Sequence, residues 1–221
     1  MSTDLENSKQ FWSSFYAEDI RSERVLPPSQ FAAFVAQELE PHTAILDVGC
    51  GEGRDSIFFA EMGFQVIALD RCPDAIRLAN EKSQRRQLSN LRFVVSDLNS
   101  EFLQEIISSV GNGKLCVYAR FFLHAISQAE QTRFFETLSM NIGNGSLLAF
   151  EYRTEEDRFL EKSTQSHFRR YQTSEYLNRE LESLNFIKRY AVEGRGFAKY
   201  KCDDAIVARC IFEKKSTADS P

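Results

Sequence analysis

Three alternate glycines, Gly49, Gly51 and Gly53, stand between an apolar run and a helical pattern in the segment ILDVGCGEGRDS. Glycine has no Cβ, so a ligand can lie directly on such a backbone, and the start of the next helix offers free N–H groups. Asp47 precedes the first glycine by two residues, and its carboxylate would repel a pyrophosphate but attract a cationic ligand. The spacing G-x-G-x-G also differs from the G-x-G-x-x-G of dinucleotide folds. A tight strand-to-helix turn is the simpler alternative.

A second carboxylate, Asp70, ends the next apolar run, FQVIALD. In doubly wound folds an acid at this place accepts hydrogen bonds from ribose hydroxyls. The glycine loop, Asp47 and Asp70 together are typical of a site for a nucleoside that carries no phosphates.

The motifs LDVGCGEG and VIALD resemble the first two motifs of class I S-adenosylmethionine-dependent methyltransferases, and the order of elements extends the resemblance over about residues 29–150. The resemblance implies methyl transfer as the activity and S-adenosyl-L-methionine as the cofactor. Within that family, GEGRDS and ARFFLHAIS look closest to tellurite-resistance-like enzymes and to small methyltransferases associated with bacterial surface glycans.

The resemblance also assigns cofactor contacts beyond the glycine loop. Asp97 in RFVVSDLNS would contact the adenine amino group, with the backbone N–H of Leu98 beside it, although a helix N-cap or a turn is the alternative for Asp97. The backbone after the run KLCVYA would approach the methionine part. The expected cofactor-binding residues are Asp47, Gly49, Cys50, Gly51, Gly53, Asp70, Arg71, Asp97, Leu98 and Ala119.

The acceptor site is expected where the fourth and fifth strands end. Methyl transfer from a sulfonium needs alignment of donor and acceptor and no metal, but a hydroxyl acceptor needs a general base and an anionic acceptor needs cations. The candidates for general base are His124, His167 and Glu151. The candidates for substrate binding are Arg120, Arg153, Arg169, Arg170 and Tyr171.

Each of these residues could instead have a purely structural role. His124 follows Arg120 by four residues, so the two would share a face if the stretch is helical. A buried histidine bonded to backbone is the alternative for His124, and a solvated charged face is the alternative for residues 167–171. The segment 151–171 is expected to cover the substrate.

We expect a small polar or anionic acceptor, such as a sugar, a phosphorylated sugar or a glycan terminus. An oxyanion acceptor of the tellurite kind and a non-catalytic cofactor-binding module are alternatives. A nucleic-acid methyltransferase is disfavoured by the net charge of −5 and by the lack of an Asn/Asp-Pro-Pro-aromatic motif. The oligomeric state is not predicted.

The elements that must position these residues alternate between short apolar runs and helical patterns, as in βαβ units. Strands are expected at residues 44–48, 65–69, 91–95, 114–118 and 146–150, followed by an antiparallel pair at 186–193 and 204–212. Helices are expected near 7–18, 29–40, 54–62, 74–86, 101–110, 127–141 and 173–184. The fold class is α/β. By resemblance it is a Rossmann-like seven-stranded methyltransferase sheet of order 3-2-1-4-5-7-6, with the last strand antiparallel and helices on both faces.

Length and composition indicate the number of domains and the cellular location. A chain of 221 residues favours one domain, here residues 1–221 with N-terminal helices at about 7–40. The five cysteines form no Cys-x-x-Cys pair, and the charged N-terminal segment lacks a signal-peptide pattern. No apolar run is long enough to span a bilayer, so a cytoplasmic location is expected.

Overall fold

The computed structural model describes residues 27–110, 113–162, 167–200 and 203–215. The helix expected at residues 7–18 lies outside these ranges.

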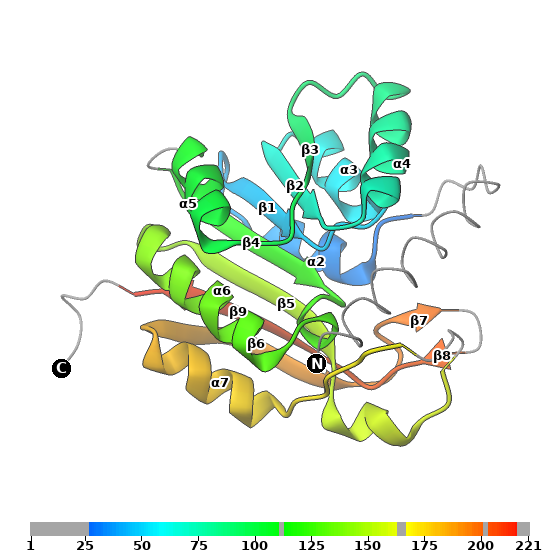
Figure 1. Cartoon of the computed structure of the whole chain (residues 1–221), viewed down its shortest axis with the longest axis vertical. Helices are drawn as coiled ribbons and strands as arrows, with labels where there is room; N and C mark the ends of the chain where they lie inside the picture. Colours follow the sequence, from blue (N-terminus) through cyan, green and yellow to red (C-terminus); the bar gives the residue numbers. More distant parts are fainter. Residues whose placement is uncertain (1–26, 111–112, 163–166, 201–202, 216–221) are drawn as a thin grey trace.

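The centre of the molecule is a seven-stranded sheet, shown in Figure 1. Its strands lie in the order β3 (Leu91–Val95), β2 (Val66–Asp70), β1 (Ala44–Val48), β4 (Leu115–Arg120), β5 (Leu147–Arg153), β9 (Val207–Lys214) and β6 (Phe186–Gly194). The strand β9 runs antiparallel to both of its neighbours, and the other pairs are parallel. Because β9 is the seventh strand of this sheet along the chain, the expected order and the antiparallel last strand are confirmed.

Apolar clusters cover both faces of the sheet. On one face, α2 (Gln30–Glu38) and α3 (Arg54–Glu61) pack on side chains such as Ile45, Ala68 and Tyr118. On the other face, α5 (Ser100–Ser109), α6 (Gln128–Asn141) and α7 (Ser174–Ser183) enclose the larger cluster. The helix α4 (Pro73–Gln84) packs along β2 and β3.

The start of α3 differs from the starts of most other helices. The helices α2, α5, α6 and α7 begin with a side chain that accepts a hydrogen bond from their first turn; the capping residues are Ser29, Asn99, Ser127 and Thr173. In contrast, α3 begins after Gly53, which caps no N–H group. The first N–H groups of α3 therefore remain available to a ligand.

Two strands run further than the sequence predicted. The strand β4 continues to Arg120 and β5 continues to Arg153, so Arg120, Glu151 and Arg153 belong to the sheet itself. After β4 the chain turns at Phe121, whose φ is 56°, into the 3-10 helix η1 (Leu123–Ala125). Arg120 and His124 therefore do not share a helix, and the condition under which they would share one helical face is not met.

Three short elements had no sequence signal. The 3-10 helix η2 (Glu155–Phe159) follows β5, and β7 (Lys199–Tyr200) pairs with β8 (Asp203–Asp204) in a separate two-stranded sheet. In Figure 1 this small sheet and η2 lie at the end of the large sheet where β5 terminates.

Candidate functional site

The glycine loop lies at the carboxyl edge of the sheet. Gly49, Gly51 and Gly53 have φ values of 74°, 56° and 79°, a left-handed conformation that favours glycine. The backbone N–H groups of Gly49 and Cys50 both donate to the carbonyl oxygen of Leu69, at 2.8 and 3.0 Å. These bonds dock the loop on the end of β2.

Two of the three glycines are required by the protein's own packing. A Cβ on Gly49 would lie 2.9 Å from Phe122 Cδ2, and a Cβ on Gly53 would lie 2.6 Å from Phe93 Cζ. Both distances are shorter than real Cβ atoms tolerate. Aromatic rings from the middle of β3 and from just after β4 therefore occupy space beside the loop, which the sequence did not reveal.

Asp70 holds the loop through both of its carboxylate oxygens. Its Oδ2 accepts from the backbone N–H of Gly51 at 2.9 Å, and its Oδ1 accepts from the N–H of Cys72 at 2.8 Å. Burial raises the pKa of Asp70, and these two hydrogen bonds oppose the rise. A carboxylate has about four acceptor positions, so Asp70 can accept two further donors such as ribose hydroxyls.

Asp47 is buried beneath the loop and hydrogen-bonded to α3. Ser56 Oγ donates to Asp47 Oδ2 at 2.5 Å, and only 3% of Asp47 is exposed. Burial raises its pKa from 3.8 to about 8, which the bond from Ser56 opposes and the charge of Asp55 reinforces. A cationic ligand beside this carboxyl would favour its charged form.

The remaining expected cofactor residues lie near the ends of β2, β3 and β4. Asp97 is exposed after β3 and does not cap α5, because Asn99 does, so the N-cap alternative for Asp97 is wrong. Leu98 has a φ of 60° and donates its N–H to Ser96 Oγ at 3.2 Å. Arg71 is partly buried, and Ala119 is fully buried within β4. The residue types and their edge of the sheet fit a nucleoside cofactor.

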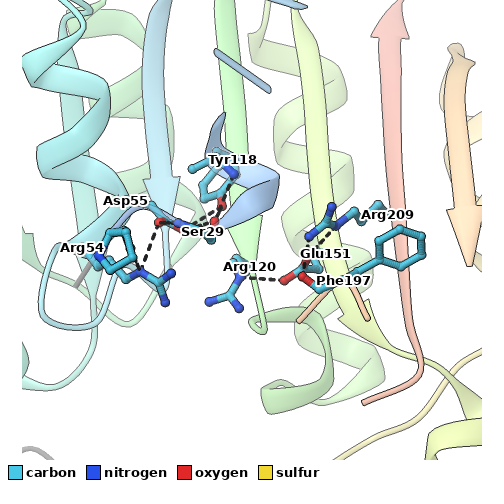
Figure 2. A network of polar contacts seen from close by, with 10 residues as sticks. Ser29, Arg54, Asp55, Tyr118, Arg120, Glu151, Phe197 and Arg209 are labelled. Atoms are coloured by element: carbon cyan, nitrogen blue, oxygen red, sulfur yellow. Dashed lines mark hydrogen bonds and ion pairs between the residues drawn. The ribbon is translucent and has the colours of Figure 1, made fainter. Parts of the chain in front are cut away.

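Glu151 joins two arginines across three strands, as Figure 2 shows. Its Oε1 accepts from Arg120 Nε at 2.6 Å, and its Oε2 accepts from Arg209 Nε at 2.7 Å. Glu151 is fully buried, Arg209 also donates to the carbonyl oxygen of Phe197, and the three residues are register partners on β4, β5 and β9. With both oxygens paired, this geometry argues against Glu151 as the general base that the sequence suggested.

Arg153 is paired within the protein. Its guanidinium donates to Asp157 Oδ2 and to Asp203 Oδ2, each at 2.7 Å, and its side chain is only 10% exposed. Asp157 also accepts from the N–H of Ile206 at 2.9 Å. Arg153 therefore ties β5 to η2 and to the small sheet, instead of presenting a guanidinium to a substrate as expected.

Arg170 is also committed to the protein. Its guanidinium donates to the carbonyl oxygens of Leu123 and Ile126 at 3.1 and 3.2 Å, and to the side-chain oxygens of Gln128, Gln131 and Gln172. The backbone N–H of Arg170 donates to the carbonyl oxygen of His124 at 2.8 Å. These bonds connect the segment that follows residue 166 to η1 and α6, and they argue against the expected role of Arg170 as a substrate ligand.

His124 combines burial with an unsatisfied ring nitrogen. It is 4% exposed, and its Nδ1 has no hydrogen-bond partner among the described residues. Its ring packs edge-on against Phe121, with centroids 5.6 Å apart. Burial, together with the positive charges of Arg153 and Arg169, holds the pKa of His124 well below its usual value. His124 is therefore neutral near pH 7, with one buried nitrogen that a ligand could satisfy.

The electrostatics group the other acceptor candidates around His124. His167, Arg169 and Arg170 all act on its pKa, so these side chains share one region beside η1. Burial raises the pKa of Tyr171, and the positive charge of Arg169 opposes that rise. The residues after β4 and those at 167–170 thus lie close together. Arg209, Asp157 and Asp203, which pair with Glu151 and Arg153, had no recognisable signal in the sequence.

The described residues contain no cluster of metal ligands and no helix that could span a membrane. No group of three or more His, Cys, Asp or Glu side chains in these ranges is placed to hold a metal ion. In the same ranges, no helix has the length and apolar character needed to cross a bilayer.

Comparison with known families matches one part of the chain. A family described as "Methyltransferase domain" matches residues 39–110, which run from the start of β1 through the glycine loop to the end of α5. This is the segment that carries Asp47, Asp70 and Asp97.

Three curated relatives match over segments of similar length. A 2-heptyl-1-hydroxyquinolin-4(1H)-one methyltransferase of Mycobacteroides abscessus is 39% identical over 59 residues, 27% of this chain and 26% of the relative. A probable S-adenosyl-L-methionine-dependent methyltransferase TehB of Haemophilus influenzae is 33% identical over 70 residues, 30% of this chain and 24% of the relative. A 23S rRNA (uracil(1939)-C(5))-methyltransferase RlmD of a Shewanella species is 38% identical over 74 residues, 31% of this chain and 16% of the relative. The chain thus spans about a quarter or less of these relatives.

A solved structure matches nearly the whole chain. Magnesium protoporphyrin IX methyltransferase from Synechocystis, with bound S-adenosylhomocysteine, superposes with a TM-score of 0.67 at 15% identity, covering 96% of this chain and 100% of the other. At this identity the match establishes the fold.

Proposed function

We propose that this chain, a class I S-adenosylmethionine-dependent methyltransferase by its fold and by the family match over residues 39–110, methylates a small polar or anionic acceptor. S-adenosyl-L-methionine is the cofactor that the match supports. When bound, it supplies a methyl group on a sulfonium.

The chain's own residues would hold that cofactor at the carboxyl edge of β1, β2 and β3. Asp70 would accept the ribose hydroxyls on the acceptor positions that Gly51 and Cys72 leave open. Asp47 would attract the cofactor's ammonium group beneath the loop. Asp97 and the backbone N–H of Leu98 would contact the adenine. The backbone at Gly51 would approach the ligand most closely, because the other two loop glycines are packed against Phe122 and Phe93.

One observation carries the acceptor part of the proposal, namely the unsatisfied, buried Nδ1 of His124. A neutral imidazole accepts a hydrogen bond at its unprotonated nitrogen. With the proton on Nε2, Nδ1 of His124 would accept from a hydroxyl or N–H group of the methyl acceptor and align it there. His167, Arg169 and Tyr171 lie in the same electrostatic neighbourhood and would favour a negative charge elsewhere on the acceptor. Arg153 and Arg170 would support this region as structural residues.

The cofactor part is tested by calorimetry with S-adenosylhomocysteine. Gly51→Val should abolish binding, because a branched side chain would stand where the cofactor lies and Gly51 has a φ of 56°. Gly63→Ala is the matched control, since Gly63 also has a positive φ, of 94°, but a Cβ there meets nothing within 4 Å. Equal affinity in the Gly51→Val variant would overturn the site.

The acceptor part is tested by turnover. His124→Ala should lower turnover by about 10- to 100-fold, while the cofactor affinity stays within about twofold. The exposed His42, in the turn before β1, provides the control His42→Asn, which should change neither quantity. Unchanged turnover in His124→Ala would refute the acceptor assignment.

The acceptor class itself requires a panel of compounds. It should contain a sugar, a sugar phosphate, tellurite, a hydroxyquinolone and an rRNA fragment, since two similar proteins are named for the last two of these substrates. Methylation of the sugar compounds would support the proposal, and methylation of tellurite alone would favour the oxyanion alternative. Methylation of RNA alone would contradict it, and cofactor binding without any turnover would favour a binding module.

A further inference from the structure

The residues Arg120, Glu151 and Arg209, here called the charge ladder, hold more positive than negative charge. Two guanidinium groups share the single carboxylate of Glu151. The ladder therefore carries one surplus positive charge at a place where Glu151 and Arg209 are 0% and 7% exposed. A surplus charge in such a place is stabilised by a further anion.

The surplus positive charge is most exposed at Arg120. The side chain of Arg120 is 21% exposed, three times as much as that of Arg209. Arg209 uses Nε on Glu151 and Nη2 on the carbonyl oxygen of Phe197. Arg120 uses Nε on Glu151, and its guanidinium lies over the Phe121 ring, 4.6 Å from the ring centroid. Among the described residues its two Nη groups have no hydrogen-bond partner. Two N–H-bearing nitrogens of one planar fork thus remain for a ligand, and such a fork matches a carboxylate.

The position of Arg120 identifies the part of the cofactor that it faces. Asp47 pairs in register with Tyr118, and Arg120 lies two residues further along β4 on the same face. That face is covered by α2 and α3. In Figure 2 Arg120 lies between Glu151 and the start of α3, where Arg54 and Asp55 are found.

The acidic groups near Arg120 do not compete for its Nη groups. Asp55 accepts from the N–H of Ser29 at 2.8 Å, from Ser29 Oγ at 2.7 Å and from the Tyr118 hydroxyl at 2.8 Å. Asp47 accepts from Ser56. Both carboxyl groups are thus held by other donors, and the fork of Arg120 stays available.

We propose that Arg120 binds the α-carboxylate of the methionine part of S-adenosylmethionine, and not the methyl acceptor. The inference rests on the proposed cofactor. Asp47 and Arg120 would then face the two opposite charges of one amino-acid group, the ammonium and the carboxylate. Glu151, held from behind by Arg209, positions the guanidinium of Arg120.

The test compares two ligands that differ by one carboxylate. S-adenosylmethionine and decarboxylated S-adenosylmethionine share the sulfonium, the ammonium and the nucleoside, so the ratio of their dissociation constants isolates the carboxylate. The wild type should prefer the complete cofactor by about 10- to 100-fold, the range expected for a charge-assisted contact. Arg120→Gln should bring this ratio close to one while affinity for the decarboxylated ligand is retained.

Arg189→Gln is the control, because Arg189 lies on β6, is 54% exposed and pairs with Glu213, outside the charge ladder. It should keep the wild-type ratio. If Arg120→Gln does not fold, as judged by circular dichroism, Arg120→Lys keeps the charge but loses the fork and should reduce the ratio several-fold.

The outcomes separate this inference from the proposed function. A wild-type ratio preserved in Arg120→Gln, or in Arg120→Lys where that variant is needed, overturns the inference and leaves the cofactor site intact. An equal loss of the ratio in Arg189→Gln also overturns it, because the effect would then not be specific to Arg120. Failure of the wild type to bind either ligand overturns the proposed function itself.

Discussion

Asp70 and Gly51 are joined by a hydrogen bond of 2.9 Å, in which the backbone N–H of Gly51 donates to Asp70 Oδ2. The carboxylate expected to bind the ribose thus also fixes the central glycine of the loop. A substitution at Asp70 therefore changes both a ligand contact and the shape of the surface on which the ligand lies.

We expect Asp70→Ala to weaken S-adenosylhomocysteine by at least about tenfold, since charge-assisted hydrogen bonds each contribute roughly 1.5–3 kcal/mol. Asp70→Asn should fall between the alanine variant and the wild type, because its one side-chain oxygen can still accept from a backbone N–H. Calorimetry measures both, and thermal unfolding checks that each variant is folded. Wild-type affinity in Asp70→Ala would mean that this residue does not contact the cofactor.

Asp47 should make stability fall as pH rises. Its pKa is raised from 3.8 to about 8 on folding, so between these values the folded chain holds a proton that the unfolded chain has released. The free energy of unfolding then decreases with rising pH by at most about 1.4 kcal/mol per pH unit for one proton. Asp47→Asn removes this contribution.

Urea denaturation of both proteins at about pH 5 and about pH 8 measures that contribution. Relative to Asp47→Asn, the wild type should lose stability between the two values. A difference between the proteins that is independent of pH, or that favours the wild type at high pH, would show that Asp47 is already ionised in the folded chain.

Glu151→Gln should act on stability. Removing the charge leaves the guanidinium groups of Arg120 and Arg209 without their shared carboxylate, and breaking a buried pair in this way costs about 3–5 kcal/mol. Glu213→Gln is the control, because Glu213 pairs with the largely exposed Arg189 and should cost about 1 kcal/mol or less. A stable Glu151→Gln protein with lost turnover would restore Glu151 as a general base.

Arg170→Lys should destabilise the fold by about 2–3 kcal/mol, because lysine cannot serve carbonyl and glutamine oxygens on η1, α6 and residue 172 at once. Arg158→Lys is the control, since Arg158 is 61% exposed and pairs only with Glu155 in the described ranges. Urea denaturation compares the two. Equal stability of both variants would mean that the hydrogen bonds of Arg170 do not stabilise the fold.

The sequence predicted the sheet well because its signals are local. Alternating apolar runs and helical patterns predicted the strands and helices, and the resemblance to a known family predicted the strand order. The loop glycines were recognisable by their spacing. The pairings around the acceptor region were not predictable in this way. Glu151 meets Arg209 across 58 positions of the chain, and only the register of β5 and β9 brings them together.

Shorter signals were misplaced by a few residues. The sequence could not show whether Asp97 or its near neighbour Asn99 begins α5, because both residue types cap helices equally well. Strands of two residues, such as β7 and β8, have no periodicity to detect. The unsatisfied Nδ1 of His124 depends on what surrounds it in space, and no sequence pattern encodes that.

The place of β9 between β5 and β6 has a consequence for the order of folding. In the described sheet β6 pairs with β9 alone, although β6 and its helix α7 come earlier in the chain. During synthesis β6 is therefore made before its partner strand, and it stays unpaired until residues 207–214 have been made. Until then the edge of β5 offers unpaired backbone groups to other chains, so the growing polypeptide is most exposed to aggregation just before β9 enters.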